Sequence, residues 1–121
     1  MKVMVVDDER IVLESCRKVC AAEGWEVIIM PSADAALEKL SEVRPSLFLI
    51  DMKMPVHDGI YLMDRIKEKA PDVPIIVMSG YHTRETIEES KKKGAVFFLM
   101  KPFTPDELVE AVSQVLNRKG A

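Results

Sequence analysis

Five short apolar runs, separated by stretches in which apolar residues recur three and four positions apart, organise the chain. The runs lie at residues 3–6, 27–30, 47–50, 75–78 and 95–100. They lack polar alternation, which is typical of strands buried on both faces of a parallel sheet. The intervening stretches, around residues 12–20, 36–40, 62–66, 83–93 and 108–116, have the period of amphipathic helices with one buried side.

Strand and helix alternate five times, which predicts an α/β fold with right-handed crossovers and five helices on both faces of the sheet. We expect a doubly wound, flavodoxin-like parallel sheet of five strands in the order 2-1-3-4-5. No repeat or linker divides the sequence, so residues 1–121 are predicted to form a single domain. Ligands of such sheets bind outside the carboxyl ends of the strands, beside strands 1 and 3.

Two helices carry distinct signals. Thr104 can cap the last helix, Pro105 suits its first position, and Glu107 can complete a capping box. By contrast, the stretch 83–93 offers only Ile87 as a large apolar residue, so we expect it to be weakly anchored. It is either an ordinary solvent-facing helix or a mobile functional element, and its place between two candidate site residues favours the second reading.

Polar residues follow four of the five apolar runs directly. Asp7 and Asp8 follow the first run, Asp51 the third, Ser79 the fourth and Lys101 the fifth. Because parallel strands end at one edge of the sheet, these five side chains are expected to converge on one crevice.

Three carboxylates in one crevice repel one another, by about 1 kcal/mol per pair at 4 Å in water and about 4 kcal/mol at an effective dielectric of 20. Lys101 supplies one compensating charge, whereas Mg²⁺, or Mn²⁺ in its place, supplies two and prefers oxygen ligands. With Asp51 as nucleophile and Ser79 as hydrogen-bond donor, the set has the parts that phosphoryl transfer requires. The alternative is acidic residues that merely lie near helix starts, where the helix dipole favours them.

The motifs VVDDE at 5–9, LIDMKMP at 49–55 with DG at 58–59, MSG at 78–80 and MKPF at 100–103 resemble those of response-regulator receiver domains of two-component systems. The resemblance runs from residue 3 to residue 115. It implies that Asp51 is the phosphoacceptor and that Asp8, Asp51 and the backbone carbonyl of Lys53 bind Mg²⁺. Asp7 would act largely through a water molecule.

The same resemblance assigns roles to the ends of the last two strands. Ser79 and Lys101 would contact the phosphoryl group, and Lys101-Pro102 would be a cis peptide. Phe98, three positions before the lysine, would be the aromatic switch that follows Ser79 inward. Most relatives have tyrosine there, so the switch would lack a hydroxyl; a plain core phenylalanine is the alternative.

The implied function is a phosphorylation switch rather than an enzyme, because the domain catalyses only its own phosphorylation and dephosphorylation. A histidine kinase, a phosphotransfer protein or a small donor such as acetyl phosphate would supply the phosphoryl group. The face formed by the helix at 83–93, the last strand and the last helix would then control a downstream protein or effector domain, and it could also form a homodimer.

Two other functions stay open. The first is a Mg²⁺-dependent phosphohydrolase, although such enzymes typically have an acid where this chain has Lys53. The second is a docking module that is never phosphorylated, although every expected site residue is present.

Composition narrows the partners and the location. The net charge is −3 and basic residues are scattered apart from residues 91–93, so direct nucleic-acid binding by this chain is not expected. The apolar runs are far shorter than the roughly 20 residues of a membrane span, and we expect a soluble, cytoplasmic protein.

The cysteines and histidines are given plain structural readings. Cys16 and Cys20 fall on one helix face and are expected to be core residues rather than a metal or redox pair. His57 and His82 are expected to be loop residues near the crevice, because two histidines without a third ligand do not specify a metal site.

Overall fold

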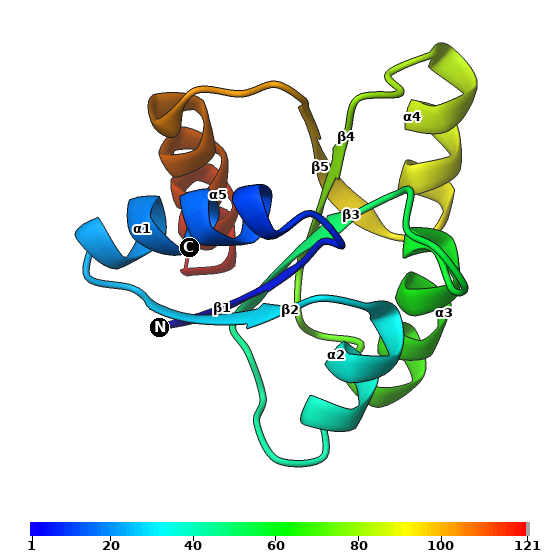
Figure 1. Cartoon of the computed structure of the whole chain (residues 1–121), viewed down its shortest axis with the longest axis horizontal. Helices are drawn as coiled ribbons and strands as arrows, with labels where there is room; N and C mark the ends of the chain where they lie inside the picture. The colour runs from blue at the N-terminus through cyan, green and yellow to red at the C-terminus, as the bar shows by residue number, and fades with distance from the viewer. Residues whose placement is uncertain (121) are drawn as a thin grey trace.

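The computed structural model describes residues 1–120, within which five parallel strands alternate with five helices (Figure 1). The strand order is β2-β1-β3-β4-β5, which confirms the predicted topology. Ala121, the last residue of the predicted domain, lies outside the described residues. The elements are β1 (Lys2–Val6), α1 (Arg10–Ala22), β2 (Glu26–Met30), α2 (Ala33–Lys39), β3 (Leu47–Asp51), α3 (Gly59–Lys69), β4 (Ile75–Ser79), α4 (Arg84–Lys92), β5 (Ala95–Met100) and α5 (Pro105–Gly120).

Helices cover both faces of the sheet. Figure 1 shows α1 and α5 on one side, and α2, α3 and α4 on the other. Alternate residues of β3 point to opposite faces, so Phe48 and Ile50 pack in the core with α3, while Leu47 and Leu49 pack in the core with α1 and α5. The two cores hold the strand ends in register, which fixes where the site residues emerge.

The three central strands and the two edge strands differ in burial. Residues 3–6 of β1 and all residues of β3 and β4 are buried, as predicted. The prediction that every run is buried on both faces is wrong for β2 and β5. No residue of β2 is fully buried, and in β5 Val96 is 45% and Met100 54% exposed. An edge strand has a neighbour on one side only, and the helix layers cover it incompletely.

The last helix begins as its sequence predicts. The Glu107 N–H donates to the Thr104 hydroxyl at 3.1 Å, and the Thr104 N–H donates to the Glu107 carboxylate at 2.9 Å. This reciprocal pair is the capping box, and it satisfies two backbone donors that the first helical turn would otherwise leave unpaired. The cap fixes the start of α5 three residues beyond Pro102.

The start of α3 is packed tightly against the end of β3. Asp58 caps the helix by accepting from the Tyr61 N–H at 3.0 Å. A Cβ atom at Gly59 would lie 2.6 Å from the Asp51 carbonyl oxygen, so the close approach of helix and strand requires glycine. The backbone of Asp51 is therefore held directly by α3.

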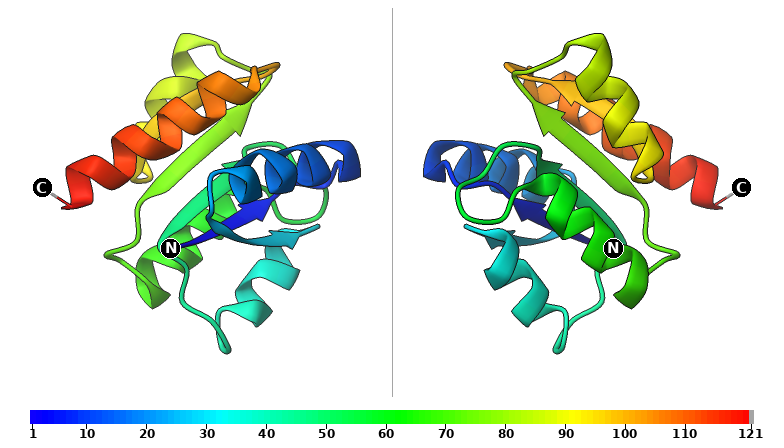
Figure 2. Two further views of the ribbon diagram at one scale, coloured as in Figure 1. Left: turned by 90° about the vertical axis from the view of Figure 1, so that its left-hand side faces the viewer. Right: turned by 90° about the vertical axis from the view of Figure 1, so that its right-hand side faces the viewer.

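The anchoring of α4 is weak, as the sequence predicts. Figure 2 shows α4 and α5 against opposite faces of β5. Of the residues in α4, only Ser90 is buried, and its hydroxyl donates to the Ile87 carbonyl at 2.8 Å. An ion pair of 3.2 Å between Lys93 Nζ and Asp64 Oδ1 joins the end of α4 to α3.

Among residues 1–120, no helix combines the length and apolar character that a membrane crossing needs.

Candidate functional site

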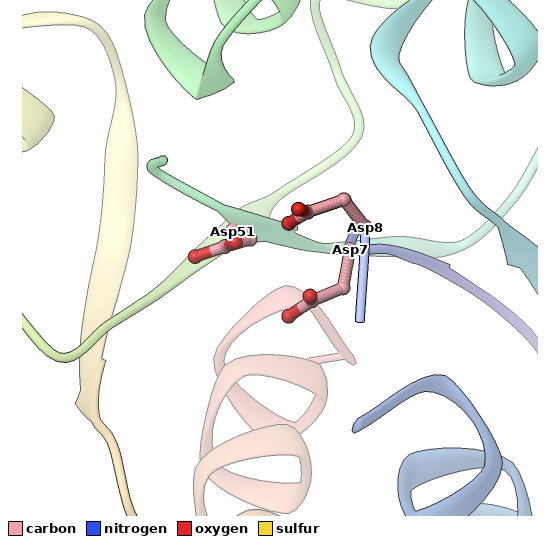
Figure 3. A group of neighbouring side chains, drawn as sticks. All are labelled: Asp7, Asp8 and Asp51. Atoms are coloured by element: carbon pink, nitrogen blue, oxygen red, sulfur yellow. The ribbon is translucent and has the colours of Figure 1, made fainter. Parts of the chain in front are cut away.

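Acidic side chains gather where β1 and β3 end. Asp7 and Asp8 follow β1 and Asp51 is the last residue of β3, and each offers a carboxylate oxygen within 4.8 Å of the others (Figure 3). Asp7 and Asp51 are buried, whereas Asp8 is exposed. One side of the cluster is therefore buried, and the other faces solvent.

Lys101 joins this cluster from the end of β5. Its ammonium group lies 2.7 Å from Asp7 Oδ2 and 3.4 Å from Asp51 Oδ1, although the residues are far apart in the sequence. The Lys101-Pro102 peptide bond is cis, as the resemblance implies. Glu9, which the sequence reasoning did not single out, lies 3.8 Å from the same ammonium. Its position directly after Asp8 in the acidic run was the available signal.

The charges of the cluster perturb one another. Burial and the neighbouring charge of Asp7 raise the pKa of Asp51 to about 6, with Lys101 and the Lys53 backbone N–H partly opposing them. Burial opposes the charge of Lys101, but its contacts with Asp7 and Asp51 outweigh that effect and raise the pKa of the ammonium. One ammonium does not balance the carboxylates, so the oxygen-rich cluster fits a hard divalent cation such as Mg²⁺.

Ser79 is the last residue of β4, and its backbone carbonyl accepts from the Lys101 N–H at 2.9 Å. Its buried hydroxyl accepts from the Tyr81 N–H at 2.9 Å and donates to the Tyr81 carbonyl at 3.3 Å. In this structure the hydroxyl is thus engaged by the chain that leads to α4. Its predicted contact with a phosphoryl group stays a prediction.

Lys53 lies two residues after Asp51, and Phe98 lies on β5 three residues before Lys101. The Lys53 ammonium lies 5.5 Å from the centroid of the Tyr81 ring, a cation–π distance, and the Lys53 backbone N–H acts to lower the pKa of Asp51. Phe98 is partly buried against the core on the α3 side of the sheet. The metal-binding role of the Lys53 carbonyl and the switching role of Phe98 stay predictions.

The plain readings of the cysteines are confirmed. Cys16 and Cys20 are buried and free, and burial raises the pKa of the two thiols to about 12 and about 11. His82 is exposed in the loop after β4. His57 is in the loop after β3, as expected, but it has partners that the sequence did not indicate: its Nδ1 atom lies 2.9 Å from Asp34 Oδ1.

Comparison with known proteins identifies the family and the fold. The family model described as the response regulator receiver domain matches residues 3–113. The chain belongs to this family. Receiver domains are signalling domains of two-component response regulators, and they generally bind Mg²⁺ at an acidic pocket. Asp7, Asp8 and Asp51 form an acidic cluster in this chain.

Individual relatives agree with this assignment. Sporulation initiation phosphotransferase F of Bacillus subtilis is 34% identical over 98% of this chain and 95% of its own length. The transcriptional regulatory protein PrrA of Mycobacterium leprae is 34% identical over 99% of this chain, which spans only 52% of PrrA. The crystal structure of a CheY-like receiver domain protein from Methanospirillum hungatei matches with a TM-score of 0.93 and 29% identity, covering 98% of this chain and 95% of that one.

Proposed function

We propose that residues 1–121 form a single receiver domain that takes a phosphoryl group onto Asp51 and thereby changes its contacts with a partner. The observation that carries the proposal is the convergence of Asp7, Asp8 and Asp51 within 4.8 Å, with Lys101 paired to two of them. In the reaction the bond from phosphorus to the donor breaks and a bond from phosphorus to an Asp51 oxygen forms.

A divalent cation completes this site. Asp8, Asp51 and the backbone carbonyl of Lys53 would hold Mg²⁺ directly, and Asp7 would contribute through a water molecule. When bound, Mg²⁺ neutralises the charge that accumulates on the phosphoryl oxygens during transfer. The mixture of buried and exposed carboxylates supports this assignment, because a hexacoordinate ion retains several waters on the open side.

The chain's own groups supply the remaining contacts. Lys101 already lies within 3.4 Å of Asp51, so its ammonium can bind a phosphoryl oxygen with little movement. The Ser79 hydroxyl must give up the hydrogen bond that it donates to the Tyr81 carbonyl before it can donate to the phosphoryl group. Phosphorylation would therefore loosen the chain that leads into α4.

The output face consists of α4, β5 and α5. Weak anchoring of α4 supports movement there, because few apolar contacts must break. Val96 and Met100 expose apolar surface on β5, which suits contact with a downstream protein, an effector domain or a second copy of the chain. Phe98, on the same strand, would take the space that Ser79 vacates.

We infer that the phosphoryl donor binds a surface other than the output face. A groove of about 470 Å³ beside Lys101 is lined by Ile11 and Val12 of α1 and by Phe103, among others. Ile11 is 81% exposed, an unusual position for a large aliphatic side chain next to a polar site. We place the histidine kinase or phosphotransfer protein here, with acetyl phosphate needing no such surface.

Labelling of the chain by acetyl phosphate tests the phosphoacceptor. The wild-type chain should gain one phosphoryl group in a Mg²⁺-dependent reaction, and Asp51→Asn should gain none, as measured by intact mass. Asp72→Asn changes an exposed aspartate away from the site and should label normally. Full labelling of Asp51→Asn would contradict the assignment. Sustained turnover of small phosphate esters would instead favour the phosphohydrolase, and a wild-type chain that binds no Mg²⁺ would favour the docking module.

Substitution of two exposed apolar residues, Ile11 and Val96, tests the donor face and the output face independently. Ile11→Glu should slow transfer from a phosphohistidine protein by tenfold or more, a change of about 1.4 kcal/mol, while leaving labelling by acetyl phosphate unchanged. Val96→Glu, on β5, should leave both reactions unchanged and weaken only partner binding or dimerisation. Equal transfer rates for Ile11→Glu and wild type would move the donor to another surface.

A further inference from the structure

The loop that joins β3 to α3, residues 52–58, contains a strained turn. The His57 N–H donates to the Pro55 carbonyl at 2.9 Å, which closes a tight turn around Val56. Val56 has a φ of 69°, in the left-handed region that β-branched residues rarely adopt. Its side chain is 90% exposed, so its own packing does not compensate the strain. A conformation of this kind persists only where the surrounding structure holds it.

The side-chain contacts of His57 hold this turn in place. Its Nδ1 atom lies 2.9 Å from Asp34 Oδ1 in the first turn of α2, and because a carboxylate only accepts, the imidazole is the donor. Its ring stacks on Tyr61 of α3, with centroids 3.8 Å apart and planes inclined by 8°. The Arg65 guanidinium lies 4.2 Å from the centroid of the same tyrosine ring. The strained turn is thus tied to two helices at once.

We propose that His57, held by Asp34 and Tyr61, is a positioning residue for the Mg²⁺ site. The inference rests on the proposed function, in which the Lys53 carbonyl is a metal ligand. The Gly59 N–H donates to the Met52 carbonyl at 3.0 Å and closes the base of the loop, while the His57 contacts fix its far side. Lys53 lies between these two attachments, so the direction of its carbonyl depends on both.

Loss of the His57 contacts allows the turn around Val56 to relax and the Lys53 carbonyl to leave the ligand position. Mg²⁺ then binds more weakly, but the phosphoacceptor and Lys101 stay in place. The expected signature is therefore a higher Mg²⁺ requirement with an unchanged labelling rate at saturating Mg²⁺. A purely structural role would lower the melting temperature without this separation.

The test titrates the full chain with Mg²⁺ and follows the backbone amide signals of residues 51–59 by NMR. His57→Ala and Asp34→Ala should each weaken Mg²⁺ binding about threefold to tenfold, the range expected for loss of one such contact. The double variant should be little weaker than His57→Ala alone, because both changes remove the same interaction. Labelling by acetyl phosphate at limiting and saturating Mg²⁺ supplies the second readout.

Three variants serve as controls. Glu42→Ala breaks the ion pair between Lys39 and Glu42 at the other end of α2. The exposure of this pair, 38% and 65%, matches the 37% and 62% of the side chains of His57 and Asp34. This matched change should leave Mg²⁺ affinity unaltered. His57→Phe keeps a ring on Tyr61 without the donor, and His57→Asn keeps a donor near the Nδ1 position without the ring. Each should restore part of the affinity lost in His57→Ala.

The positioning role of His57 and the proposed function fail on different results. Wild-type Mg²⁺ affinity in folded His57→Ala and Asp34→Ala would overturn the positioning role and leave the proposed function intact. A wild-type chain that binds no Mg²⁺ would overturn the proposed function. In that case amide hydrogen exchange of residues 53–58 tests the hold directly: faster exchange in His57→Ala but not in Glu42→Ala supports it, and equal exchange overturns it.

Discussion

The helices α3 and α4 cover the same side of the sheet but are attached in opposite ways. α3 buries Gly59, Leu62, Met63 and Ile66, and its first residue touches the backbone of Asp51. α4 buries only Ser90 among its residues, and it follows a loop in which Tyr81 and Thr83 are exposed. The first helix supports the acidic cluster, whereas the second can be displaced at small cost in buried surface.

This difference separates two requirements of a phosphorylation switch. Transfer to Asp51 needs fixed geometry, because small displacements of a reacting group lower the rate. A response needs an element with two states of similar free energy, so that new contacts shift the population. In the proposed function, α3 meets the first requirement and α4 the second, and the bonds between Ser79 and Tyr81 link the end of β4 to the loop before α4.

Truncating a core contact in each helix should give the largest contrast. Leu62→Ala removes a fully buried side chain from α3 and should lower the free energy of unfolding by about 3 kcal/mol. Ile87→Ala, at a partly exposed site on α4, should lower it by about 1 kcal/mol. Urea unfolding followed by circular dichroism measures both. Equal losses would remove the contrast between the helices.

Changing the glycine at the start of α3 and the glycine before α4 to alanine should give the next largest difference in stability. Gly59→Ala puts a Cβ against backbone atoms of Asp51 and Met52 and should destabilise the fold by about 2 kcal/mol. It should also reduce labelling of Asp51, because that backbone must shift. Gly80→Ala places its Cβ in open space among the described residues and should leave the melting temperature nearly unchanged. Differential scanning calorimetry separates the two variants.

The charge of Asp51 should destabilise the fold when Mg²⁺ is absent. Its pKa is raised from 3.8 to about 6, so the folded state binds more protons than the unfolded state across that range. Stability from this group is highest below about pH 4 and falls as the pH rises to about 6. Asp51→Asn should therefore be about 1–2 kcal/mol more stable than wild type above pH 6, with no difference near pH 3.

Added Mg²⁺ should stabilise the wild-type chain and leave Asp51→Asn nearly unaffected, which narrows the difference between them. Thermal unfolding at several pH values, with EDTA or with Mg²⁺, measures this change. A wild-type chain that is more stable than Asp51→Asn at pH 7 in EDTA would contradict the assigned direction.

The smallest effect concerns the ion pair between the two helices. Lys93→Ala removes the contact with Asp64, and because both side chains are more than a third exposed, the loss of stability should be below about 1 kcal/mol. Amide exchange should nevertheless rise in α4 and stay constant in α3. Arg84→Ala, which removes an exposed ion pair within α4, is the control and should leave the position of α4 unchanged.

Much of the site could be predicted before the structure. The order of the strands places Asp7, Asp8, Asp51, Ser79 and Lys101 at one edge, and the structure confirms that the three aspartates and Lys101 meet there. The capping box at Thr104 and the weak anchoring of α4 were equally visible, because both follow from local spacing. The exposure of the edge strands was not, since β2 and β5 are as apolar in sequence as the strands between them.

By itself, the sequence determined the alternation of strands and helices and the polar residues at the ends of four of the five strands, because both can be read along short stretches of chain. Only the tertiary structure decided that the Ser79 hydroxyl is held by Tyr81 and that His57 meets Asp34. The first contact joins residues only two apart and depends on the side-chain rotamer of Ser79. The second depends on how α2 packs beside the loop between β3 and α3, which no local sequence pattern encodes.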